Sequence, residues 1–366
     1  MKTGAVRTEV DYAWPPFVRP KPGISVVYLD LNHWISLAKA AVGHPDGTKS
    51  RQALDALREL RGAEKVLLPL SATHYMEMTR ITSARHRFDV ANVMEELSDF
   101  ACLMNRNIVI RLELQEAFCQ VIGENARVHN VLPIVGDGVM QAFGMRGGLR
   151  IRDQDGCDVT DAARASWPEG PKAFDIWQQG AERWLNRAVL TGPSYEEEAE
   201  LRELGWDPVK ATEVSKQRAQ QERDQAARLA EDSRWRRGRL RDVVAARYLA
   251  LEIQPTLEIE ASMRGINFPT LFPTPLAARR FTDSMPSADV WITLLTARHR
   301  NPQTRWTAND IYDADALSVA VPYCDFVATE RHATHLLHAA GLPTRVNTVV
   351  VSDLHELVDA ITGVRN

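Results

Sequence analysis

Residues 309–332 read NDIYDADALSVAVPYCDFVATERH, and the apolar pattern changes partway along this stretch. Up to about Val321 the apolar residues recur at helical spacing, whereas CDFVATE is a short run typical of a strand buried in a sheet. Acidic residues occur throughout, although buried segments seldom contain them. The stretch therefore predicts a helix followed by a strand, with acids that need an explanation.

The same alternation of strands and helices recurs at both ends of the chain. ISVVYLD, closed by Asp30, and EKVLLPLS have the pattern of buried strands, and each precedes a helical segment. NIVIRLE predicts a third strand from Ile108 to Leu112, and TRVNTVVVSD predicts the last one. This order predicts an α/β fold, a parallel sheet flanked by helices.

The middle of the chain differs from its ends. It contains Gly-rich and Pro-containing pieces and the long charged helical tract SKQRAQQERDQAARLAEDSRWRRGRLRDVVAARYLALEI. The sequence therefore predicts one α/β domain in two halves, 24–112 and 286–364. The halves are separated by a mainly helical insertion or second domain, 113–285, and preceded by a Pro-rich lead, 1–23.

Composition limits the classes of partner. The net charge of −4 gives the whole chain no attraction for nucleic acid or anionic lipid, so such binding needs a local patch. The four cysteines form no CxxC pair, which favours reduced thiols, and neither a signal peptide nor an apolar run of about 18 residues occurs. We expect a cytoplasmic protein that does not contact membranes.

Several acids are expected at one edge of the predicted sheet. The carboxyl ends of parallel strands meet at a common edge, where ligands bind in α/β folds. Asp30 and Glu330 end two strands, while Glu77 and Asp313 lie on helices that reach the same edge. Asp325 precedes its strand and is expected at the opposite edge, with a structural role.

Such a cluster of carboxylates needs a compensating cation, because like charges raise one another's pKa values. Carboxylate oxygens suit Mg²⁺ or Mn²⁺, which can activate water and neutralise a phosphodiester transition state. Helical counting favours Asp313 over Asp315, since residues three, four and seven positions after Asp313 are apolar. It also puts Asp310 on the Asp313 face as a possible extra ligand.

These segments resemble the motifs of PIN-domain metal-dependent nucleases. YLDLNHW looks like their first Asp-x-Asn signature, LSATHYMEM is similar to their second motif, and DADALSVAVPYCDFVATER resembles the third and fourth. The resemblance covers roughly 24–112 and 286–364. It implies that Asp30, Glu77 and Asp313 bind metal and that Asn32 and Ser71 are supporting polar residues in contact with substrate. Where the family usually has Asp or Asn two residues after the Thr, this chain has Arg331, and Glu330 comes one position early.

Each of these residues also has a structural interpretation. Asp30 could cap the following helix, Glu77 could be a surface residue, and Asp310 and Asp313 could serve the helix dipole. His332, His335 and His338 recur every three residues, but no HExxH pattern accompanies them, which favours a solvated face over a metal site.

RWRRGRLR is the strongest basic cluster, and it suggests substrate contacts by Arg234, Arg236 and Arg237. Such a run could equally be a solvated face paired with the acids before it. No GxxxxGK[ST], GxGxxG or GxSxG motif supports a nucleotide cofactor or a serine hydrolase.

The combined prediction is a Mg²⁺- or Mn²⁺-dependent nuclease that hydrolyses RNA or another single-stranded nucleic acid. Two alternatives stay open: a PIN-like module that binds RNA or protein without cleaving it, and a phosphohydrolase acting on small phosphoesters. A protein regulator is possible, and the sequence does not specify the oligomeric state, the biological role or the preferred nucleic acid.

Overall fold

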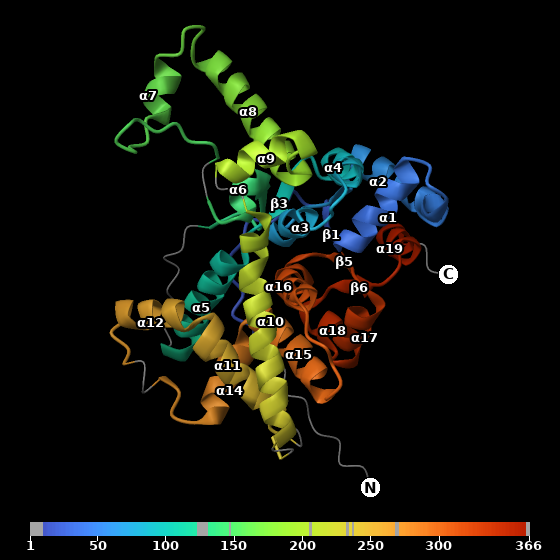
Figure 1. Ribbon diagram of the computed structural model, residues 1–366. Coiled ribbons are helices and arrows are strands. Elements are labelled where there is room, and N and C mark those ends of the chain that lie inside the picture. The colour runs from blue at the N-terminus through green and yellow to red at the C-terminus, as the bar shows by residue number, and fades with distance from the viewer. Residues whose placement is uncertain are drawn as a thin grey trace.

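The computed structural model describes residues 10–122, 131–145, 148–204, 207–231, 234–235, 238–267 and 271–363. Helices surround a small sheet of four parallel strands in the order β2-β1-β5-β6 (Figure 1). The strands are β1 (Ser25–Leu29), β2 (Val66–Leu67), β5 (Phe326–Ala328) and β6 (Val349–Val351). The expected parallel sheet is confirmed, although helices dominate the chain more than the sequence suggested.

Strand β1 lies in the middle of the sheet and is buried on both faces. Val26 and Tyr28 point into one hydrophobic core, and Val27 and Leu29 point into the other, as alternation along a strand requires. Because β1 pairs with β5 through residues from opposite ends of the chain, the two predicted halves do form one sheet.

The helices of the first half follow the expected order with one break. They are α1 (Leu31–Ala41), a 3₁₀ helix (Pro45–Ser50), α2 (Arg51–Gly62), α3 (Ala72–Met78) and α4 (Ala84–Ser98). The helical segment that follows EKVLLPLS, from Ala72 to Phe88, is not one continuous helix. Instead α3 ends at Met78, and Ser83 starts α4 by accepting a hydrogen bond from the backbone N–H of His86.

The predicted third strand, Ile108–Leu112, is wrong. These residues belong to helix α5 (Arg106–Ile122), and the strand β3 (Ala101–Leu103) comes just before it. Asn105 begins the helix by accepting a 3.0 Å hydrogen bond from the backbone N–H of Asn107. The helix then buries Glu113, whose carboxylate accepts a hydrogen bond from the Ser287 backbone N–H at 2.9 Å.

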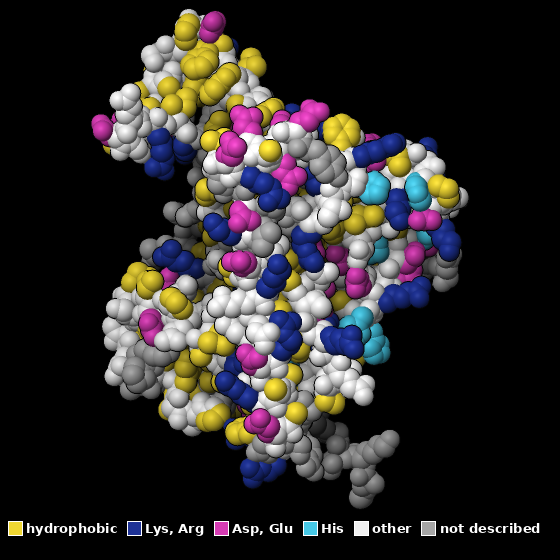
Figure 2. All heavy atoms as spheres, in the orientation of Figure 1, with side chains coloured by type: hydrophobic (Ala, Val, Ile, Leu, Met, Phe, Trp, Pro, Cys, Tyr) yellow, Lys and Arg dark blue, Asp and Glu magenta, His cyan; other side chains and the backbone are white. Residues whose placement is uncertain are grey.

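The middle of the chain is mainly helical where it is described. Its elements are β4 (Val135–Asp137), α6 (Gly138–Ala142), α7 (Thr160–Ala165), α8 (Pro171–Thr191), α9 (Tyr195–Glu203), α10 (Pro208–Glu231), α11 (Leu240–Arg247), a π-helical turn (Tyr248–Glu252), α12 (Gln254–Met263) and α14 (Pro275–Ser284). Helix α7 and the first part of α8 project from the body, and α8 carries exposed hydrophobic side chains such as Ile176 and Trp184 (Figures 1 and 2).

Much of this middle segment shares a core with the sheet. Leu240, Tyr248 and Leu257 pack in the same hydrophobic cluster as Val26 and Leu317. Strand β4 also pairs antiparallel with β3, across the boundary expected near residue 112. Helix α7 and the first part of α8 project, whereas the second part of α8 packs against α4 and α6 and buries Leu190 in the other core cluster. The rest of the described middle segment therefore packs largely as part of the α/β body.

The C-terminal half agrees closely with the sequence. It contains α15 (Pro286–Arg300), α16 (Ala308–Tyr323), α17 (Arg331–Ala339), α18 (Leu342–Val346) and α19 (Leu354–Thr362). Asp325 lies before β5, at the edge opposite Asp30, where it accepts a 2.8 Å hydrogen bond from the Val26 backbone N–H. Its expected structural role is confirmed. Among the described helices, none has the length and apolar character needed to cross a membrane.

Candidate active site

The carboxyl ends of β1 and β5 bring residues from both ends of the chain together. Asp30 follows β1, and Thr329 and Glu330 follow β5, its parallel neighbour. The backbone N–H of Asp30 donates a 2.9 Å hydrogen bond to the carbonyl of Ala328. Asp30 and Glu330 therefore share one edge of the sheet, as the topology predicted.

Asp30 is buried, with 9% of its surface exposed. The Thr329 hydroxyl donates a 3.1 Å hydrogen bond to its carboxylate. Burial raises the pKa of Asp30, while the Thr329 hydrogen bond and the nearby His33 act in the opposite direction. Asp30 precedes α1, but its side chain makes no capping hydrogen bond, so a capping role does not account for it.

Glu77 lies near the end of α3. Burial, followed by the charge of Asp30, raises the pKa of Glu77 to about 8, and the charge of Arg80 only partly opposes this. Glu330 raises it further. Glu77 is therefore partly buried, and the charges of Asp30 and Glu330 at the strand ends raise its pKa. It is not an exposed surface glutamate.

Asp313 lies on α16, which packs against α3. Burial raises the pKa of Asp313 to about 8, and the charges of Asp30, Glu77 and Glu330 add to the effect. The Arg80 side chain donates a hydrogen bond to Asn309 and stacks over Tyr312, which fastens the end of α3 to the start of α16. This contact fixes the two helical acids relative to each other.

Glu330 is the most exposed of the four acids. The Asn32 amide donates a hydrogen bond to its carboxylate, joining the start of α1 to the end of β5. Asn32 thus lies at the acidic edge, where the sequence expected it, and it contacts an acid directly. Arg331, which follows Glu330, begins α17.

The structure thus brings Asp30, Glu77, Asp313 and Glu330 to one place. None of the four forms an ion pair with any residue that the structure describes. Carboxylate oxygens are the donors that Mg²⁺ and Mn²⁺ prefer, so the donor chemistry fits such an ion. In the described part of the chain, however, no three His, Cys, Asp or Glu side chains already stand close enough to hold a metal. Metal binding would therefore require side-chain rotation.

Asp310 has other partners. One carboxylate oxygen forms a 2.6 Å ion pair with Arg298, and the other accepts a 2.7 Å hydrogen bond from the Thr307 backbone N–H in a capping box. Its charge still raises the pKa of Asp313. These bonds give Asp310 a helix-capping role, which the sequence had left open beside the possible extra ligand.

Ser71 supports the site from the start of α3. Its hydroxyl is 2.7 Å from the Thr73 hydroxyl, and its backbone N–H donates to His74 Nδ1 at 3.0 Å. The other ring nitrogen of His74 contacts the Leu29 carbonyl at 2.8 Å, one residue before Asp30. Burial lowers the pKa of His74 to about 4, so the ring is neutral. Sequence reasoning missed His74, although its position three residues after Ser71 is that of a capping-box partner.

The basic tract lies away from the acids. Arg234 follows the far end of α10, whose earlier residue Arg218 is near Asp315. Glu231, the last residue of α10, is 13 positions after Arg218, which corresponds to about 20 Å along the helix, and Arg234 comes after it in the chain. Arg236 and Arg237 lie outside the described residues. Figure 2 shows acidic and basic side chains interspersed on this face, without a continuous basic surface.

The recurrent histidines make no metal group. His338 Nε2 contacts the Val350 carbonyl at 2.8 Å, so this residue ties α17 to β6. No cluster suitable for a metal includes His332 or His335 within the residues described here.

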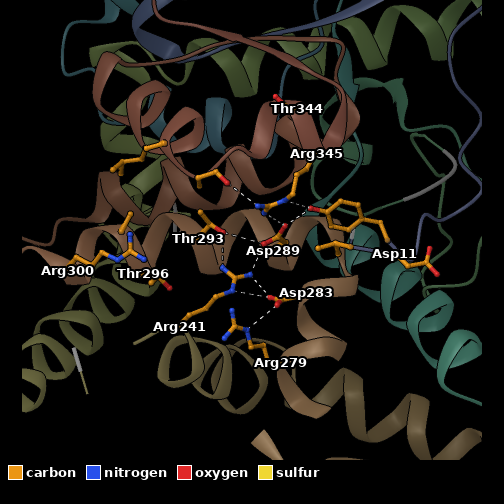
Figure 3. Close-up of a pocket in the computed structure, with 16 residues that line it drawn as sticks. Asp11, Arg241, Arg279, Asp283, Asp289, Thr293, Thr296, Arg300, Thr344 and Arg345 are labelled. Carbon is orange, nitrogen blue, oxygen red and sulfur yellow. Dashed lines mark hydrogen bonds and ion pairs between the residues drawn. The ribbon is translucent and has the colours of Figure 1, made fainter. Parts of the chain in front are cut away.

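A large cavity lies at a different place, between α11, α14, α15 and α18 (Figure 3). It measures about 1130 Å³, and its carboxylate Asp289 is paired with Arg241 at 2.7 Å and Arg345 at 2.6 Å. Because arginines already pair with Asp289, this acid differs from the acids at the sheet edge, which have no ion-pair partner among the described residues.

Comparison with known proteins gives no further assignment: the chain matches no protein-family model, no curated protein and no solved structure. Any functional conclusion must therefore come from the site itself.

Proposed function

We propose that this protein is a metal-dependent nuclease of the PIN-like class that hydrolyses phosphodiester bonds, most readily in RNA. One observation carries the proposal: burial and neighbouring carboxylates raise the pKa values of Glu77 and Asp313 to about 8, without an ion-pair partner in the described structure. A protein retains such a costly arrangement where a cation is to be bound.

Asp30, Glu77 and Asp313 would hold Mg²⁺ or Mn²⁺, which supplies activated water and positive charge for the scissile phosphate. The other residues keep these acids in position. Thr329 orients the Asp30 carboxylate through its hydroxyl, and His74 holds the end of β1. Asn32 restrains Glu330, whose charge is close enough to raise the pKa values of Glu77 and Asp313.

The proposal is tested by Asp30→Asn, assayed on labelled RNA and single-stranded DNA with Mn²⁺, Mg²⁺ or EDTA. We expect wild-type cleavage that EDTA abolishes, and a loss of about 100-fold or more in the variant. Asp325→Asn, at the opposite edge of the same sheet, is the matched control and should retain cleavage. Equal activity of wild type and Asp30→Asn, both folded by circular dichroism, would overturn the assignment.

A second candidate is a PIN-like module that binds RNA or protein without cleaving it. Arg331, at the position where the family usually has an acid or amide, and the carboxylates that do not yet converge on a metal favour it. RNA binding without cleavage in Mn²⁺ would support this candidate. Turnover of an aryl phosphate without action on RNA would instead indicate a small-phosphoester hydrolase.

A further inference from the structure

A second cavity, of about 440 Å³, lies between α3, α10 and α16. Its size falls in the range of small-molecule pockets, and apolar and polar side chains both line it. The apolar side chains that line it are Met76, Leu103, Met104, Phe143, Leu251 and Val319. Leu103 and Met104 are buried, while Phe143 and Leu251 are exposed at its edge.

The cavity adjoins the acidic site along two helices. Thr73 lines the cavity one turn before Glu77 on α3, and Ala316 lines it one turn after Asp313 on α16. These offsets of four and three residues correspond to about 6 Å and about 4.5 Å along the helix axes. Tyr312, over which Arg80 stacks, also lines the cavity, so the cavity borders the Arg80 contact as well as the two helices that carry Glu77 and Asp313.

The charged groups in the cavity wall balance one another. Arg218 pairs with Asp315 at 2.5 Å and with Glu252 at 2.9 Å, and Arg106 pairs with the same two acids at 3.4 Å and 3.3 Å. Two arginines thus neutralise two carboxylates. A phosphate would have to break these pairs, whereas an uncharged planar ring would leave them intact.

The edge of the cavity offers groups that can bind such a ring. The amide side chains of Asn107 and Gln221 line it, and neither amide forms a side-chain hydrogen bond with another described residue. Amide groups bind the hydrogen-bonding edges of bases, and aromatic rings such as Phe143 stack on their faces. Val214, with 64% of its surface exposed, stands at the mouth on α10.

We propose that this cavity receives one unpaired nucleobase of the substrate, with the adjoining phosphate at the carboxylates. The proposal rests on the proposed nuclease function for its biological meaning, but base binding can be measured without cleavage. Base and phosphate are joined through one ribose, which suits two sites one helical turn apart. A base in a duplex cannot enter, so the cavity would select single-stranded RNA.

The test uses the full-length protein in EDTA with adenosine, guanosine, cytidine and uridine, observed by saturation-transfer NMR. Val214→Trp places a large ring at the mouth, while Gln217→Trp puts the same ring on exposed α10 surface outside the cavity. We expect transfer to the base protons of at least one nucleoside from wild type and Gln217→Trp, and at least a fivefold weaker signal from Val214→Trp. Circular dichroism verifies that both variants fold.

No saturation transfer from wild type, or equal transfer from both variants, would overturn the base-binding proposal. A cleavage assay with Mn²⁺ separates this result from failure of the nuclease assignment. Nucleoside binding without any cleavage would support base binding in the cavity and contradict the nuclease proposal. If single-stranded and duplex RNA are cleaved at equal rates and Val214→Trp does not change these rates, the nuclease proposal would be supported and the base-binding proposal contradicted.

Discussion

Asp313 and Asp315 lie two positions apart on α16, and of the two only Asp315 has an arginine partner among the described residues. Arg218 contacts both oxygens of Asp315, at 2.5 Å and 2.9 Å. Two positions turn the side chains by about 200° around the helix, so the acids face different surroundings. Arg106 and Arg218 lower the pKa of Asp315 against the effect of burial, whereas burial and four other acids raise the pKa of Asp313.

This contrast predicts opposite phenotypes for two matched substitutions. Asp313→Asn should reduce metal-dependent RNA cleavage by about 100-fold or more, because it removes a proposed metal ligand. It should leave the fold intact. Asp315→Asn should instead destabilise the protein by about 3 kcal/mol, since it leaves the two buried arginines with Glu252 as their only remaining carboxylate partner in the described structure.

Cleavage rates and thermal unfolding of both variants, measured in parallel, check this prediction. The control is the rate of folded Asp315→Asn at low temperature, which should remain near that of wild type. A catalytic loss in Asp315→Asn equal to that in Asp313→Asn, with both folded, would mean that the preference for Asp313 is wrong.

The raised pKa values predict how pH affects stability without metal. Glu77 and Asp313 bind protons more tightly in the folded state, with pKa values of about 8, than at their ordinary values near 4. Between these values the folded protein holds more protons than the unfolded one, so its stability falls as pH rises. In EDTA we expect the melting temperature to decrease from pH 5 to pH 8.

Denaturation scans with Asp313→Asn provide the control for this pH dependence. The variant lacks one of the two titrating acids, so its melting temperature should decrease less between pH 5 and pH 8 than that of wild type. The loss of unfolding free energy over this range should be smaller in the variant by an amount on the order of 1 kcal/mol. Excess Mn²⁺ should raise the stability of wild type more at pH 8 than at pH 5. A wild-type stability that increases steadily from pH 5 to pH 8 in EDTA would contradict the prediction.

A substitution of Asp310 tests whether this residue caps α16 or binds the metal ion. Asp310→Ala removes the bonds to Thr307 and Arg298, which should cost about 1 kcal/mol of stability at the start of α16. Cleavage at saturating Mn²⁺ should change by less than about threefold, because Asp310 is already engaged elsewhere. A loss as large as that of Asp313→Ala in the same assay would show that Asp310 is a ligand.

The positions of the acids could be predicted because topology alone fixes them. A carboxylate directly after a buried parallel strand must lie at its carboxyl edge, which placed Asp30 and Glu330. The helical stripe after Asp313 likewise showed which acid faces the strands. The arginine network around Asp315 could not be predicted, since Arg218 reaches it from 97 positions away through a long helix of unknown course.

The error at Ile108–Leu112 has a local cause. An alternation such as NIVIRLE fits a strand, but in the wider window the buried residues Ile110, Leu114, Ala117 and Phe118 stand at positions i, i+4, i+7 and i+8, which fit one helix face. Asn105 was the available signal for a helix start. The cavity beside α3 was equally inaccessible to sequence reasoning, because its walls come from segments more than 200 residues apart.

A substitution of Glu330 measures how much the most exposed of the four acids contributes to metal-dependent cleavage. It influences Glu77 and Asp313 through space, but it is hydrogen-bonded to Asn32 and more exposed than the other acids. Glu330→Gln keeps the contact with Asn32 and removes only the charge. We therefore expect about tenfold weaker activity at low Mn²⁺, as for residues that support a metal ligand, with much of the loss recovered at high Mn²⁺.

Titration of cleavage rate against Mn²⁺ concentration, for wild type, Glu330→Gln and Asn32→Ala, measures this contribution. Asn32→Ala frees the Glu330 side chain without changing charge, so its effect should be smaller than that of Glu330→Gln. A Glu330→Gln enzyme that no Mn²⁺ concentration restores would instead make Glu330 a required catalytic acid. Under the proposed nuclease function, Glu330 would then serve as the fourth acid of the site, with Arg331 at the start of α17.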